Sequence, residues 1–211
     1  MAVVAQHSGR TPLAALQQFV RKPRESAEFC ELCGVQLTAN HSHLLELNKR
    51  RISCACEPCS ILFVDNATQP YRRIPRDLRR LQNFLMDDHE WDSLLIPIKL
   101  AFFVDDSKAG RVVAQYPSPA GAMESSLDLE YWQTIVARNP SLNSFAPDVE
   151  ALLVNRVSNP PQYFRAPIDL CYRLVGTIRK HWHGLSGGSE VWKKIDDFFG
   201  ELNAASGGAH A

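Results

Sequence analysis

The chain has 211 residues, of which 45% are hydrophobic and 22% charged. This composition is close to the globular average and excludes wholesale disorder, collagen and coiled coils. Lysine plus arginine equals aspartate plus glutamate at 23 each, so the total charge favours neither nucleic acid nor an anionic membrane. The charge is unevenly spread, however, because twelve basic residues stand against seven acidic ones up to Arg80 and eleven against sixteen beyond it. This difference predicts two modules.

The predicted organisation has four parts. Residues 1–27 form a loose segment with a short helix at 13–20, and residues 28–82 form a metal-binding module. Residues 83–203 form an α+β domain, and residues 204–211 are a disordered tail. No stretch approaches the roughly 18 apolar residues of a membrane span, and the N-terminus lacks a basic start followed by a long apolar block. We therefore expect a cytoplasmic protein without membrane insertion.

In the first module, the apolar runs at 43–47 and 51–54 flank a polar turn at 48–50, which predicts a small hairpin. The run at 61–64 predicts a third short strand. In the second module, residues 98–104 and 111–116 predict a hairpin around the turn-rich residues 105–110.

Further along the chain, helical spacing of apolar residues at 129–136 predicts a helix, and residues 149–157 return to strand character. Two more helices are predicted at the C-terminus, one starting at Pro167 and one capped by Ser189, each with an apolar face. The predicted fold class is thus α+β: a small zinc-ribbon-like N-terminal module, followed by an α+β domain with two C-terminal helices.

Five of the six cysteines lie within thirty positions, which is the distribution of a metal site rather than of a disulfide scaffold. Cys30 and Cys33 form one C-x2-C pair, and Cys56 and Cys59 form another. Two thiolates on a tight turn can reach one ion, and two such turns complete a tetrahedron of sulfurs. The spacing predicts a structural Zn²⁺ held by these four cysteines, with iron as the alternative ion for the same ligand set.

Cys54 leaves the ligand set open, because in an extended segment Cys54 and Cys56 point to the same side. Either thiol can be the third ligand. Cys56 is favoured because it forms the two-residue pair with Cys59, which leaves Cys54 as a neighbouring or reactive thiol.

His41 and His43 lie between the cysteine pairs, an order that also occurs in HNH-type nucleases. That motif needs an Asn and a further His or Asn after the second pair, and residues 60–64 contain neither. The basic runs at 49–51, 72–73 and 79–80 are more typical of solvated faces or partner surfaces than of phosphate contacts. Nucleic-acid binding is therefore the least favoured hypothesis for the function.

Seven motifs are spread over residues 28–203: FCELCG at 29–34, HLL at 43–45, CACEPC at 54–59, LAFF at 100–103, YPSPAG at 116–121, DVEALL at 148–153 and GLSGG at 184–188. Together they resemble a bacterial family of unknown function that is often encoded in uptake [NiFe]-hydrogenase gene clusters. The resemblance implies a hydrogenase context and contributes no catalytic residues.

The expected function follows from these features. The sequence shows a metal signature without a recognisable nucleophile, base or phosphate motif, which predicts a non-catalytic accessory protein rather than an enzyme. The resemblance implies a protein partner, such as a [NiFe] hydrogenase subunit or maturation factor. The alternative is a rubredoxin-like electron-transfer protein in which the same thiolates hold iron.

Overall fold

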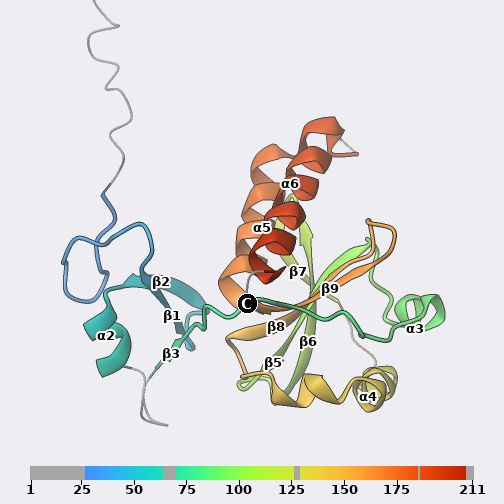
Figure 1. Ribbon diagram of the computed structural model, residues 1–211, viewed down its shortest axis with the longest axis horizontal. Coiled ribbons are helices and arrows are strands. Elements are labelled where there is room, and N and C mark those ends of the chain that lie inside the picture. Colours follow the sequence, from blue (N-terminus) through green and yellow to red (C-terminus); the bar gives the residue numbers. More distant parts are fainter. Residues whose placement is uncertain (1–26, 64–69, 126–128, 185, 208–211) are drawn as a thin grey trace, which may run out of the picture.

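The computed structural model describes residues 27–63, 70–125, 129–184 and 186–207. These residues form a small three-stranded sheet and a separate six-stranded sheet that carries two long C-terminal helices (Figure 1). The predicted α+β class is confirmed in this form. The helix predicted at 13–20 lies outside the described residues.

The small sheet consists of β1 (Ser42–Glu46), β2 (Arg51–Ala55) and β3 (Tyr71–Arg73), in the antiparallel order β2-β1-β3. The predicted hairpin is therefore present as β1 and β2. The predicted strand at 61–64 is wrong where it is described, since Ile61 and Leu62 belong to helix α2 (Glu57–Leu62). Cys56 caps this helix in an extended conformation and a proline occupies its first turn, where proline favours helix initiation.

The large sheet is antiparallel throughout, in the order β4-β9-β8-β5-β6-β7. Its strands are β4 (Arg79–Arg80), β5 (Leu100–Asp106), β6 (Arg111–Ser118), β7 (Gly121–Ser125), β8 (Glu150–Asn155) and β9 (Gln162–Pro167). The hairpin predicted around residues 105–110 is β5–β6, and the strand predicted at 149–157 is β8.

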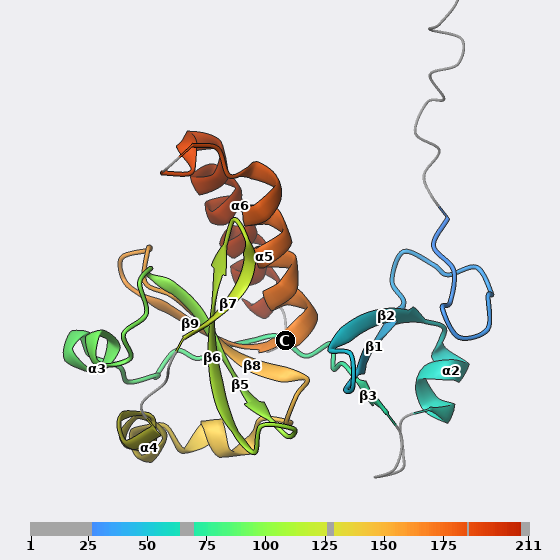
Figure 2. The same cartoon turned by 180° about the vertical axis from the view of Figure 1, so that it is seen from behind.

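The helices are α3 (Asp88–Ser93), α4 (Leu129–Arg138), the 3-10 turn η1 (Pro140–Ser144), α5 (Ile168–His181) and α6 (Gly188–Gly207). Helices α5 and α6 pair side by side and cover one face of the large sheet, while α3 and α4 lie on the other side (Figures 1 and 2). Because α6 continues to Gly207, residues 204–207 of the predicted tail are helical. No helix in the described ranges is long and apolar enough to cross a membrane.

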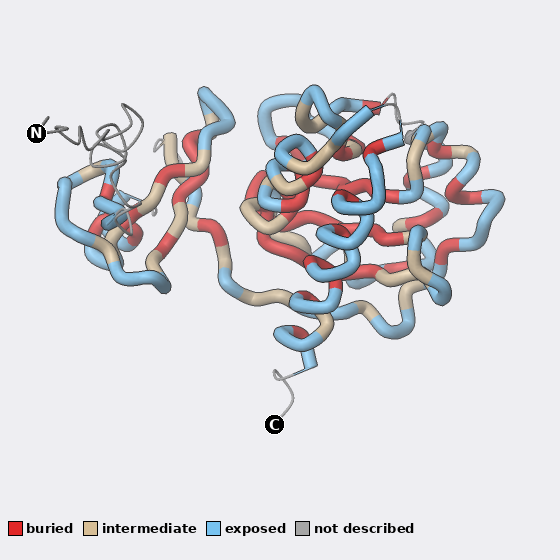
Figure 3. Tube along the Cα trace, turned by 90° about the horizontal axis from the view of Figure 1, so that it is seen from above, coloured by how far each residue is buried: buried red, intermediate tan, exposed pale blue. Residues whose placement is uncertain are grey.

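The central strands are buried on both faces, which explains their almost continuous apolar runs. In β5, Phe102 and Val104 pack toward α5 and α6, whereas Ala101 and Phe103 pack toward α3 and α4. This alternation is the two-residue period of a strand. Figure 3 shows the resulting concentration of buried residues along the large sheet.

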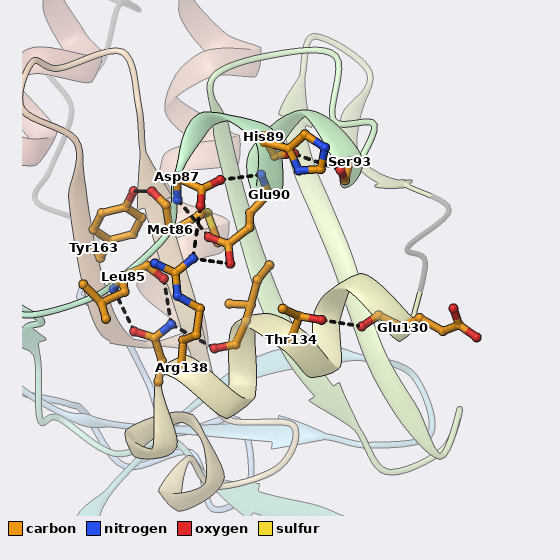
Figure 4. A network of polar contacts seen from close by, with 12 residues as sticks. Leu85, Met86, Asp87, His89, Glu90, Ser93, Glu130, Thr134, Arg138 and Tyr163 are labelled. Carbon is orange, nitrogen blue, oxygen red and sulfur yellow. Dashed lines mark hydrogen bonds and ion pairs between the residues drawn. The ribbon is translucent and has the colours of Figure 1, made fainter.

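A polar network fastens α3 to α4 on the face away from α5 (Figure 4). Asp87 caps α3 by accepting from the Glu90 backbone N–H at 2.9 Å, and the Glu90 carboxylate accepts from the Asp87 N–H at 2.8 Å. Arg138 of α4 donates to Glu90 at 2.6 Å and to Asp87 at 3.1 Å. The Glu90 N–H and the Arg138 guanidinium lower the pKa of Asp87. The network is therefore a capping box extended by one guanidinium.

The small sheet is docked on the large one through apolar and ionic contacts. Leu45 of β1 is buried in the same core as the large sheet. Arg50 forms an ion pair with Asp106, and Arg72 forms one with Asp148 at 2.9 Å. Part of the basic charge in the first module is thus matched by acidic groups of the second. Arg50 and Arg72 therefore form ion pairs within the chain, between the small sheet and the large one.

Candidate metal centre

The first cysteine pair lies on a tight loop closed by an isolated bridge between Phe29 and Gln36. The Cys30 N–H donates to the Val35 carbonyl at 2.8 Å, and the Gly34 N–H donates to the Cys30 carbonyl at 2.8 Å. Gly34 has φ +75°, a left-handed conformation that a residue with a Cβ adopts only with strain. The glycine after the pair therefore lets the loop turn back beneath its thiols.

The second pair lies where β2 passes into α2. Cys56 is the residue that caps α2, and Cys59 occupies its first turn. The Ser60 N–H donates to the Cys56 carbonyl at 2.9 Å, which begins the helical ladder. A strand end followed at once by a helical turn aims both thiols toward the first loop.

The four sulfurs of Cys30, Cys33, Cys56 and Cys59 all lie within 4.8 Å of one another. The Cys33 and Cys56 sulfurs are 3.6 Å apart. Sulfurs at the corners of a tetrahedron around zinc, each at about 2.3 Å from the ion, are separated by about 3.8 Å. All six cysteines lie in the described ranges and are free thiols. The donor set and its spacing therefore fit a tetrahedral metal ion.

The pKa values of the cluster's thiols are shifted in opposite directions. Burial raises the pKa of the Cys30 thiol, but the backbone N–H groups of Cys56, Cys33 and Leu32 outweigh this and lower the pKa to about 6. Burial raises the pKa of Cys59, and the neighbouring thiols raise it further. The pKa of one thiol is thus lowered while that of another is raised, and a divalent cation bound among the thiols would favour their ionised forms.

Two cysteines of the cluster also belong to the small module's own apolar core. The buried residues of this core are Cys30, Leu44, Ala55 and Cys59. Cys33, by contrast, is exposed, so one edge of the cluster reaches the protein surface. Among the described residues, the other members of this core are Leu44 and Ala55, and Leu32, Leu37 and Tyr71 are partly buried against it.

Cys54 separates from Cys56, although the two are only two residues apart. The chain turns at Cys56, and the Cys54 thiol lies instead within 4.8 Å of one ring nitrogen each of His41 and His43. Burial raises the pKa of Cys54, and the charges of nearby acidic groups raise it further. The grouping of His41, His43 and Cys54 was not predicted from the sequence. Grouping them requires the register of the hairpin, which places His43 opposite Cys54.

The protein is an α+β protein with a four-cysteine cluster that can bind a metal ion. The cluster by itself does not define which ion. The model of a family of unknown function, DUF5947, matches residues 29–206, and the chain belongs to that family. No curated protein and no solved structure matches the chain significantly.

Proposed function

We propose that this protein is a non-catalytic accessory protein that assists the assembly or function of a [NiFe] hydrogenase through protein contacts. In this proposal Cys30, Cys33, Cys56 and Cys59 hold a structural zinc ion. Four thiolates complete a tetrahedral shell, which leaves no coordination position for a substrate. The hydrogenase context derives from the resemblance of the seven sequence motifs described above.

The observation that carries the role in protein contacts is a set of exposed apolar side chains on the two metal-binding segments. Phe29 and Val35 flank the first cysteine pair and are 54% and 51% exposed. Ile61 and Leu62 follow the second pair at the end of α2 and are 56% and 74% exposed. Exposed apolar groups on both metal-binding segments support a surface on this module that binds another protein.

Replacing Leu62 with aspartate is expected to weaken this contact. A charge placed at an apolar interface position that costs about 1.4 kcal/mol or more weakens the affinity for the partner by a factor of ten or more. The measurement is affinity purification of the tagged full-length chain from a hydrogen-oxidising host, followed by mass spectrometry. We expect hydrogenase subunits or maturation factors to be recovered with the unaltered chain and lost with Leu62→Asp.

The matched control is Leu95→Asp, because Leu95 is 72% exposed but lies on the second module. It is expected to recover the partner at the level of the unaltered chain. Recovery of no hydrogenase-related protein by the unaltered chain would refute the proposed context. Equal loss in both variants would refute the proposed surface.

The second candidate function is electron transfer by iron bound to the same thiolates. The exposed edge of the cluster at Cys33 supports it, because a metal near the surface can exchange electrons with a docked partner. Ferric tetrathiolate absorbs visible light and zinc does not. We expect protein purified without chelator to be colourless, and visible bands together with bound iron would place electron transfer first.

A further inference from the structure

A second cluster of metal-ligand side chains lies beside β1 and β2. His43 and Cys54 are direct cross-strand partners, so their side chains lie on the same face of the sheet. His41 precedes His43 by two residues and is placed on the same side by the period of an extended chain. One ligand atom from each of the three residues lies within 4.8 Å of the others.

The hydrogen bonds of the two imidazoles determine which nitrogens carry protons. The Nδ1 atom of His41 is 2.9 Å from the carbonyl oxygen of Thr38, which can only accept a hydrogen bond. The Nδ1 atom of His43 is 2.7 Å from the Oδ2 atom of Asp169, and an ionised carboxylate also only accepts. Both Nδ1 atoms are therefore donors, and each neutral ring carries its lone pair on Nε2.

These two Nε2 atoms face each other at 3.2 Å. Two lone pairs at this distance repel unless a cation lies between them. Nitrogens bound to one zinc ion at about 2.0–2.1 Å in tetrahedral geometry are about 3.3–3.4 Å apart. The observed distance is close to that value, and the Cys54 thiol supplies a third donor near both rings.

We propose that His41, His43 and Cys54 form a second metal site, which binds zinc through two imidazoles and one thiolate. Asp169 is a positioning residue in this site, because its carboxylate holds the His43 ring with Nε2 directed at the ion. The site joins the two modules, since Asp169 belongs to α5 and the three ligands belong to the small sheet.

Three protein ligands leave a zinc ion with one open position for water or an external ligand. His41 and His43 line a cavity of about 400 Å³, which Arg76 and Asp169 also line. The cavity gives access to the open position, and the guanidinium of Arg76 favours a small anionic ligand there. This site thus differs from the four-cysteine cluster, whose shell is complete without an external ligand.

A shared proton is the competing explanation for the histidine pair. One ring would then be an imidazolium that donates to the other, supported by Asp169 and by Glu28, whose Oε2 atom is 3.6 Å from Nδ1 of His41. In that case the pair binds no metal. The stoichiometry of bound zinc distinguishes the two explanations without reference to any hydrogenase partner.

The experiment is to equilibrate the full-length chain with excess Zn²⁺, remove weakly bound ions by gel filtration, and count zinc by mass spectrometry. We expect two ions per chain in the unaltered protein, one in His43→Ala, and two in the control His181→Ala. His181 is a suitable control because it pairs with Glu190 in the other module. The proposal would be overturned if the unaltered chain and His43→Ala each bound one ion, or if each bound two.

Cys54→Ser is the second variant, because it leaves both imidazoles in place. With Co²⁺ as the probe, we expect it to remove the sulfur-to-cobalt absorption contributed by the second equivalent while the absorption of the four-cysteine cluster remains. An unchanged spectrum would overturn the role of Cys54. Asp169→Asn is expected to weaken zinc binding at the second site about 10–100-fold in competition with a chromophoric chelator. Unchanged affinity would overturn the positioning role.

Discussion

Replacing Cys30 with serine is expected to abolish metal binding at the four-cysteine cluster and to unfold the small sheet while the large sheet stays folded. Among the described residues, the small module's own apolar core has four buried members, and two of them are the cluster cysteines Cys30 and Cys59. In small zinc domains the binding of the ion supplies about 10–16 kcal/mol at neutral pH, and this energy is the folding energy. Without the energy of metal binding, so small a core cannot offset the loss of conformational entropy when this part of the chain becomes ordered.

Hydrogen exchange read by mass spectrometry tests this expectation segment by segment. The amides of β1 and β2 are expected to exchange at the rate of an unfolded chain in Cys30→Ser, whereas those of β5 and β8 remain protected. Treatment of the unaltered protein with a strong chelator is expected to give the same pattern.

The control for this variant is Cys171→Ala, which removes a fully buried thiol from α5 in the main core. It is expected to lower overall stability and to leave the metal content and the protection of β1 unchanged. Full protection of β1 in Cys30→Ser would show that docking on the large sheet, rather than the metal, holds the small module together.

Phe164→Ala is expected to lower the free energy of unfolding of the large domain by about 3–5 kcal/mol, the usual cost of removing a buried phenylalanine ring. Phe164 is fully buried at the centre of β9. Its ring lies 6.0 Å from that of Phe199 of α6, so the truncation leaves a cavity between the sheet and the helix that covers it. The strand pairing of β9 with β4 and β8 limits how far the site can collapse.

Urea denaturation followed by tryptophan fluorescence measures the effect, since the fluorescent residues Trp91 and Trp132 are buried in the large domain. Met123→Ala is the control, because Met123 on the edge strand β7 is 41% exposed and its removal is expected to cost less than about 0.5 kcal/mol. A loss below 1 kcal/mol in Phe164→Ala would contradict the central place of this ring in the core.

Local patterns predicted both hairpins, strand β8, helix α4 and the two C-terminal helices, whereas β3, β4, β7, β9 and α3 were not predicted. The two C-terminal helices were predictable because their apolar residues repeat at helical spacing. Strand β5 was predictable because its residues form an almost continuous apolar run, which its burial on both faces explains. The strand expected at 61–64 was wrong because apolar character alone does not distinguish a short strand from the end of a helix. The proline in the first turn of α2 was the local signal for the helix.

The sequence by itself determined the two cysteine pairs, because two thiols on a tight turn converge through local geometry and the two turns are joined by one hairpin. The structure settled that Cys56, and not Cys54, lies with the other three cysteines. The tertiary structure alone decided the second cluster. Hairpin register sets which residue stands opposite His43, and the turn at Cys56 directs Cys54 away from its neighbour. The contact between His43 and Asp169 spans 126 positions of the chain. Such a contact depends on how the two modules pack, and packing is a property of the assembled surfaces that no local pattern encodes.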